Sequence, residues 1–163
     1  MLRINDVHSI RLIAESAKLD LGAKIYCIAH YDNKDILTGG VIIMGDNGYS
    51  AEIHSASFRP TWGRQELLWA VFNYIFKFRG IKKLFGRVPE GNIRARKFNK
   101  HLGFKEETII EDVFSGGEGC VVMSMYEYQC RFINVRPPHV EFASLDKISI
   151  VEVHEYSQSK VGA

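Results

Sequence analysis

The sequence predicts an α+β fold of three layers, in which helices flank a mixed, mainly antiparallel central sheet. The elements occur in the order helix, three strands, helix, strand, helix, two strands, and connections between the first three strands are short enough for an antiparallel meander. Later, a strand, a helix and another strand follow one another, which implies a crossover and one parallel or mixed pairing. With 163 residues, 46% of them apolar, the chain is long enough for one domain with its own core.

The first half of the chain predicts a helix and three strands. A short amphipathic helix is expected over residues 7–19, because apolar residues recur at helical spacing after Asp6, which can cap the helix, and before Gly22, which can end it. Residues 23–30, 36–44 and 49–58 are rich in β-branched and aromatic side chains, and turn-forming residues occupy 32–35 and 45–48. These three segments are expected to be strands.

The second half predicts two helices, three strands and an extension. The longest helix is expected over residues 61–79, a strand over 83–88, a basic helix from 92 to about 101, and strands over 104–114 and 120–128. Residues 1–135 then form the main domain. The extension of residues 136–163 has edge-strand candidates at 140–142 and 147–153 and an end that is expected to fray. An exposed strand there could pair with a second chain, so a homodimer is left open.

Composition excludes several classes of protein. No apolar run reaches the roughly 20 residues that span a bilayer, and the first residues lack a signal-peptide core. The three cysteines are an odd number without a CxxC pair, which disfavours a disulfide framework and a clustered zinc site. We therefore expect a cytoplasmic protein with reduced thiols, no membrane segment and no metal site.

The charges are distributed unevenly along the chain. Residues 59–105 contain twelve Lys or Arg against two acidic residues, a charge of +10, whereas the rest of the chain carries −8. So basic a middle third indicates an anionic partner, either a phosphorylated ligand or a nucleic acid. The chain has no RNP, helix-turn-helix or zinc-finger pattern, which makes nucleic acid the weaker interpretation.

Residues 92–104, NIRARKFNKHLGF, resemble the NxxA…LGF signature of the GCN5-related N-acetyltransferase (GNAT) superfamily. Upstream, residues 58–64 (FRPTWGR) introduce the long helix where that family keeps its pyrophosphate loop. Downstream, residues 123–126 and 130–132 resemble the final strand and exit of a subgroup seen in bacteria and bacteriophages. The resemblance implies a GNAT-like sheet with flanking helices, and acetyl-CoA as cosubstrate.

The start of the long helix is the expected anion site. Its first N–H groups lack intrahelical partners and the helix dipole favours negative charge, so a pyrophosphate fits there. Gly63 admits close approach of the ligand, and Arg59 and Arg64 can pair with phosphate oxygens. Asn92 either caps the second helix or, as the resemblance implies, contacts coenzyme. The predicted cofactor-binding residues are Ser57, Arg59, Thr61, Trp62, Gly63, Arg64, Asn92 and Asn99.

Acetylation of an amine needs a base for the amine proton, a donor for the thioester oxyanion and an acid for the leaving thiolate. Glu52 and His54 project from one face of the strand that leads into the anion site. Glu52 is favoured as the base, with a bound water as a relay, and His54 is the second choice. The N–H groups of residues 55–57 are the candidates for the oxyanion contact.

The acid is not assigned. Many relatives carry a Tyr seven residues after the helix Asn, and this chain has Asn99 there, which cannot donate a full proton at neutral pH. Water, or another group such as Tyr126 or Tyr128, remains an alternative.

Two functions follow. The first is an acetyl-CoA-dependent N-acetyltransferase that acts on a primary amine by direct attack, with an acceptor that no residue identifies. The second is a non-catalytic relative that binds CoA or a protein partner. Asn99 favours the second, as does the loop, where Pro60 and Gln65 stand at positions that are Gln or Arg and a glycine in the family pattern.

Overall fold

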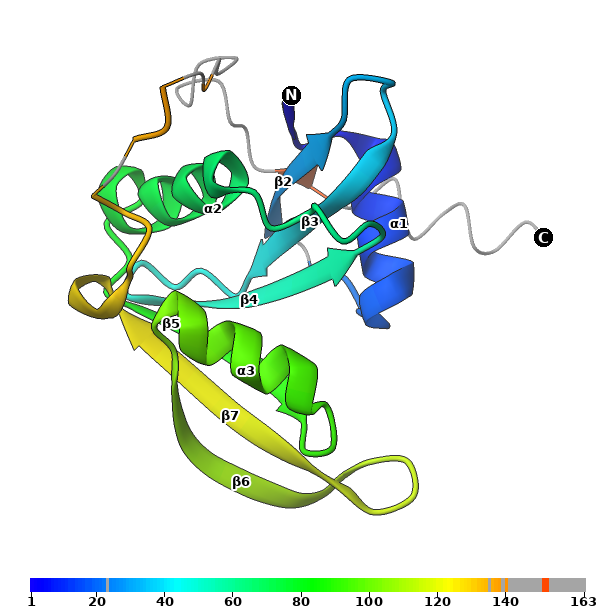
Figure 1. Ribbon diagram of the computed structural model, residues 1–163. Helices are drawn as coiled ribbons and strands as arrows, with labels where there is room; N and C mark the ends of the chain where they lie inside the picture. Colours follow the sequence, from blue (N-terminus) through cyan, green and yellow to red (C-terminus); the bar gives the residue numbers. More distant parts are fainter. Residues whose placement is uncertain (23, 135, 139, 141–150, 153–163) are drawn as a thin grey trace.

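The computed structural model describes residues 1–22, 24–134, 136–138, 140, 151 and 152. One helix, α1 (Val7–Ala17), covers one face of the central sheet, and two helices, α2 (Gln65–Phe72) and α3 (Ile93–Leu102), cover the other (Figure 1). This arrangement confirms the predicted three-layer α+β fold.

The described residues form one sheet in the order β1-β2-β3-β4-β5-β7-β6, with β8 also pairing with β2. Strands β4 and β5 pair in parallel, and every other pairing among the described strands is antiparallel. Strand β1, which covers part of the outer edge of β2, was not expected from the sequence. The strands are β1 (Leu2–Ile4), β2 (Lys24–Tyr31), β3 (Leu37–Met44), β4 (Ser50–Ser57), β5 (Lys83–Pro89), β6 (Lys105–Phe114), β7 (Glu118–Tyr126) and β8 (Val151–Glu152).

The α1 helix begins as predicted and ends earlier. The Asp6 carboxylate accepts the N–H of Ser9 at 2.9 Å, which caps the first turn. Lys18 then takes a left-handed conformation (φ 53°) and its N–H bonds back to the last turn, so the helix ends there rather than near Gly22. Ile10 and Ile13 pack on β2 and β3 in a core cluster of their own.

The long helix of the prediction, residues 61–79, is shorter and less regular in the structure. It begins at Gln65, because Arg64 is extended (φ −63°, ψ 148°), and after Phe72 it continues as a π-helix over Asn73–Phe78. The π-helix ends at Arg79, whose guanidinium donates to Asp46 in the β3–β4 turn. Phe72, the last residue of α2, and Tyr74 of the π-helix are almost fully buried in the larger core cluster, against the sheet.

The α3 helix and the strands after it follow the expected order. Gly103 ends α3 with a φ of 121°, and a Cβ at this position would overlap the carbonyl oxygen of Gln129. The glycine of the LGF motif is therefore required by close backbone packing. The β6–β7 hairpin extends beyond the helices at the bottom of Figure 1. Strand β7 ends at Tyr126, two residues earlier than expected, and Glu127–Gln129 form a 3₁₀ turn.

The described part of the extension returns to the main core. Val140 packs against the larger cluster, and the guanidinium of Arg136 lies 5.6 Å from the ring of Trp69 on α2. The strand expected at 147–153 is present as Val151–Glu152, paired with β2; the rest of both edge strands, except Val140, and the frayed end at 157–163 lie outside the described residues. The division at residue 135 stays a prediction. In the described chain, no helix has the length and apolar character needed to cross a bilayer, and the three cysteines are free and buried.

Candidate functional site

The two central strands β4 and β5 diverge. They pair over three residues, from Ser50 with Lys83 to Glu52 with Phe85, and no further pairing joins them in the described chain. We call residues 53–57 of β4 and 86–89 of β5 the strand divergence. On the side that faces the other strand, each of these segments presents backbone N–H and C=O groups as an edge strand does. An extended ligand with amide groups can pair with such edges.

The α2 helix is the next element after β4, and its N-terminus lies later in the chain than the predicted helix start. Trp62 donates its N–H to the carbonyl of Arg59 at 3.2 Å, so a turn precedes the helix. The first intrahelical bond runs from the N–H of Leu68 to the carbonyl of Arg64 at 3.1 Å. The N–H groups of residues 64–67 therefore have no intrahelical acceptor, which makes them the first-turn donors that the expected anion site requires.

The loop before α2 lies against α3. The rings of Trp62 and Phe98 are 5.2 Å apart, and a Cβ added to Gly63 would stand 3.4 Å from the Phe98 ring. Arg59, Thr61 and Arg64 are exposed, while the Ser57 hydroxyl donates to the Arg59 carbonyl at 3.3 Å. The structure thus places Trp62 and Gly63 of the predicted loop against Phe98, in the middle of α3.

Asn92 precedes the first residue of α3, whereas Asn99 lies in the second half of the helix. The Asn92 side chain accepts the N–H of Ala95 at 3.1 Å, which confirms its role as the helix cap. A coenzyme contact by Asn92 stays a prediction. The Asn99 amide lies 3.7 Å from the sulfur of Met123 on β7. Its side chain therefore faces the sheet.

Glu52 and His54 share a face of β4, as the alternation predicted, and contact each other. His54 Nε2 lies 3.2 Å from Glu52 Oε1, yet this buried nitrogen has no hydrogen-bond partner in the described chain. Arg87, on β5, donates its Nε–H to the same carboxylate oxygen from across the strand divergence. The contact with His54 and the bond from Arg87, acting against partial burial, lower the pKa of Glu52 to about 2.

The charge and the exposure of Glu52 determine how an amine would meet the pair. A carboxylate with a pKa of about 2 stays ionised at neutral pH and holds a proton poorly. The side chain of His54 is 10% exposed and that of Glu52 27% exposed, so an incoming amine meets the carboxylate first. Glu52 can therefore receive an ammonium group, with the imidazole of His54 in contact with the same carboxylate.

A second cluster of polar side chains, on the face of the sheet opposite α3, was not predicted from the sequence. Glu107 accepts a hydrogen bond from Lys83 Nζ at 2.7 Å and another from the Ser124 hydroxyl. The register of β6 shifts between Glu106 and Thr108, and this irregularity turns Glu107 towards Ser124. No periodic signal marks such a shift, nor the reach of Arg87 to Glu52.

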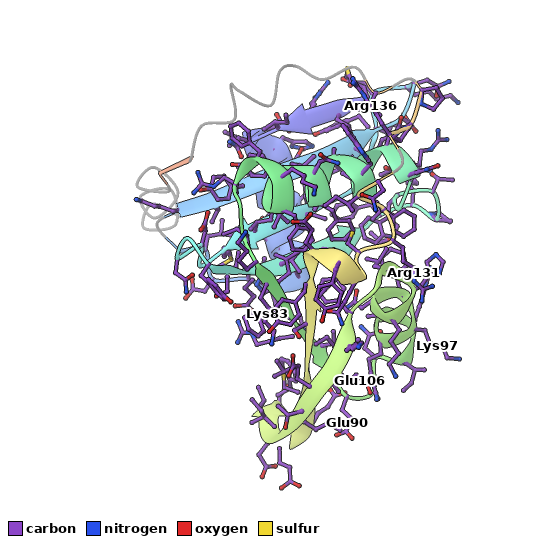
Figure 2. All side chains as sticks on the ribbon, turned by 90° about the vertical axis from the view of Figure 1, so that its left-hand side faces the viewer. Lys83, Glu90, Lys97, Glu106, Arg131 and Arg136 are labelled. Atoms are coloured by element: carbon purple, nitrogen blue, oxygen red, sulfur yellow. The ribbon has the colours of Figure 1, made fainter. Side chains whose placement is uncertain are left out.

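Half of the cations of residues 59–105 are paired with acidic residues. Six of the twelve cations form ion pairs with acidic residues from outside that segment: Lys77 with Glu127, Arg79 with Asp46, Lys83 with Glu107, Arg87 with Glu52, and Arg96 and Lys100 with Glu106. Figure 2 shows Glu106 on β6 and Lys97 on the outer side of α3. Within the described chain, six exposed cations of this segment form no ion pair: Arg59 and Arg64 before α2, Lys82 before β5, Arg94 and Lys97 on α3, and Lys105 at the start of β6. Arg59 and Arg64 thus leave unpaired positive charge at the start of α2.

Comparison with solved structures confirms the expected fold. A chimera of the spermidine N-acetyltransferase SpeG from Vibrio cholerae and hSSAT has a TM-score of 0.64 at 18% identity, over 78% of this chain and 96% of that one. SpeG from Vibrio cholerae in complex with CoA and spermine has a TM-score of 0.63 at 16% identity, over 79% and 96%. A putative acetyltransferase has a TM-score of 0.59 at 18% identity, over 74% and 65%. No protein-family model and no curated protein matches the chain.

Proposed function

We propose that this protein is an acetyl-CoA-dependent N-acetyltransferase that acts on a primary amine. The observation that carries the proposal is the strand divergence, because the chain runs from its β4 side into the N-terminus of α2. The pantetheine arm of coenzyme A contains amide groups that can pair with the two strand edges, and its diphosphate suits the free N–H groups of residues 64–67. Arg59 and Arg64 are exposed beside that terminus and supply positive charge.

The reaction uses the Glu52 and His54 pair. Glu52 binds the amine as an ammonium ion, and a proton released from it passes to Nε2 of His54, 3.2 Å from the carboxylate. The freed amine attacks the thioester carbonyl and forms the C–N bond; the C–S bond then breaks, coenzyme A leaves as its thiolate, and the new amide nitrogen gives its second proton to solvent. Asn99 cannot protonate that thiolate, so solvent supplies the proton and turnover is expected to be slow.

The second candidate is a non-catalytic protein that binds coenzyme A or a protein partner. It is favoured by the contact between Trp62 and Phe98, which occupies space between the α2 entry and α3. It is also favoured by Asn99, whose amide is directed at Met123 rather than at an open position.

Calorimetry with acetyl-CoA, followed by an assay of thiol release, tests both candidates. Spermidine and spermine are the first amines to offer, because one structural neighbour holds spermine; a lysine-containing peptide and an aminoglycoside widen the panel. We expect micromolar binding and amine-dependent release of coenzyme A. Binding without release for any amine supports the non-catalytic candidate, and the absence of binding refutes both coenzyme-based functions.

A further inference from the structure

A buried histidine links the sheet to the first turn of α2. His30 on β2 is 3% exposed. Its Nδ1 lies 2.7 Å from the hydroxyl of Thr38 on β3, and its Nε2 lies 2.8 Å from Oε1 of Glu66 on α2. Both ring nitrogens are engaged, so three elements meet at this one side chain. The proposed transfer reaction makes no use of it.

Glu66 occupies a position where a carboxylate would compete with a bound anion. It is the second residue of α2, in the turn whose free N–H groups are the proposed diphosphate contacts. Carboxylates in a first turn are attracted by those groups and by the helix dipole. No side chain caps α2, because Arg64 makes no capping bond and the Glu66 carboxylate is hydrogen-bonded to His30 instead.

We infer that His30 is a positioning residue for coenzyme binding, which holds Glu66 against the sheet and so keeps the first-turn N–H groups of α2 open to the diphosphate. The inference rests on the proposed function, since it assumes that the diphosphate binds there. It also predicts the direction in which loss of His30 acts: a released Glu66 carboxylate turns to its own helix terminus and competes with the ligand.

The hydrogen bonds of His30 are compatible with two protonation states. In the neutral ring, Nε2 donates to Glu66 and Nδ1 accepts the Thr38 hydroxyl. In the charged ring, Nδ1 donates, and the Thr38 hydroxyl turns to a second acceptor, the His30 carbonyl, 3.1 Å away. Burial, followed by the positive charge of the Met1 amino group, lowers the pKa of His30; Glu66 acts in the opposite direction, and Arg64 adds to the lowering.

Protonation of His30 therefore offsets the charge of Glu66 without breaking their contact. As the pH falls through the pKa of His30, the wild-type protein gains a positive charge beside the anion site that a His30→Gln variant lacks. We expect the coenzyme affinity of the wild type, relative to that variant, to rise on acidification. The comparison cancels the titration of the coenzyme's own phosphates, because both proteins bind the same ligand.

The decisive experiment is a double-mutant cycle on the dissociation constant of coenzyme A, measured by calorimetry at pH 8. His30→Leu should weaken binding about fivefold, the size expected for a charge at a helix terminus, and Glu66→Gln should leave it equal or tighter. The double variant should bind as Glu66→Gln does. A purely structural role for His30 predicts instead that the double variant binds as weakly as His30→Leu, and that result overturns the inference.

Two controls separate this inference from the proposed function. Glu127→Gln, which removes a paired carboxylate at the other end of the α2 and π-helix segment, should leave the affinity unchanged. Circular dichroism and thermal melting of each variant show whether it is folded. If the wild type binds no coenzyme, the proposed function fails and the inference with it; equal dissociation constants for wild type and His30→Leu overturn the inference alone.

Discussion

The two halves of the sheet differ in how many of their faces are covered. In the first half, β2 and β3 lie between α1 and α2, and every residue of β2 after Lys24 is buried. In the second half, β7 has α3 on one face only, and β6 is exposed along nearly its whole length. The half that is covered twice supplies most of the core, and the half that is covered once presents charged side chains on a free face.

The charged pairs and the buried histidine are distributed according to this difference in coverage. The pairs of Arg87 with Glu52 and of Lys83 with Glu107 lie on the face of the sheet opposite α3, at and beyond the boundary between the halves, where no described helix covers β5 to β7. A polar group can stay ionised there because solvent reaches it. The covered half holds His30 instead, buried and hydrogen-bonded through both nitrogens.

The largest effect should come from a cavity in the covered half. Ile42 on β3 is fully buried, and Ile42→Ala should lower the free energy of unfolding by about 2–5 kcal/mol. The matched control is Ile110→Ala on β6, where the side chain is 50% exposed and the change should be within about 0.5 kcal/mol. Urea unfolding measures both. Similar losses for the two variants would break the comparison between the halves.

The next effect concerns the boundary between the halves. Glu52→Gln should lower turnover by about 100-fold and leave coenzyme affinity unchanged, because the carboxylate acts on the amine only. His54→Gln should lower turnover too, and the double variant should lose little more than the worse single variant, since the pair acts as a unit. Release of coenzyme A is the measurement. Full activity in Glu52→Gln would eliminate this residue.

A proline at the start of α2 tests the proposed anion site at the N–H groups of residues 64–67. Gln65→Pro removes one N–H donor, and the first helical position with its extended predecessor accepts proline without strain. Coenzyme should bind about tenfold more weakly, as expected for one lost hydrogen bond to a charged group, while the melting temperature changes little. Gln65→Ala keeps the N–H and is the control. Unchanged affinity in Gln65→Pro would place the diphosphate elsewhere.

The cations outside ion pairs should matter more than those already paired. Arg64→Gln should weaken coenzyme binding about threefold at low salt, with less effect at high salt, because its charge is exposed and screened. Lys77→Gln, which loses a cation paired with Glu127, should bind coenzyme as the wild type does. Calorimetry at two salt concentrations decides. A larger loss for Lys77→Gln would contradict the assignment of the anion site.

The smallest expected effect is on stability in acid. The pKa of Glu52 lies at about 2 in the folded chain against an ordinary value of 4.5, so its ionised form stabilises the fold above pH 4.5 and this contribution is lost as the pH falls towards 2. Over that range, the free energy of unfolding should decline less steeply in Glu52→Gln than in the wild type. Equal slopes in urea titrations would mean that Arg87 and His54 do not stabilise the carboxylate.

Local sequence patterns determined the elements, their order and much of the site. Helical and alternating periodicity depend on near neighbours, so α1, α3 and the strands of the meander were predictable, as was the shared face of Glu52 and His54. The crossover predicted a parallel pairing, which the structure has between β4 and β5. The LGF segment carried the resemblance from which the fold was expected, and the comparison with solved structures confirms that fold.

The tertiary structure alone decided which charges meet. The sequence separates +10 and −8 into different segments, yet strand pairing brings acids of β4 and β6 beside cations of β5 and α3. The partner of Arg87 depends on how far β4 and β5 diverge, and that of Glu107 on a shift in strand register. His30 meets Glu66 across 36 positions of the chain, because a sheet and a helix pack face to face. Such contacts depend on strand register and on packing between residues far apart in the chain, which a local sequence pattern does not encode.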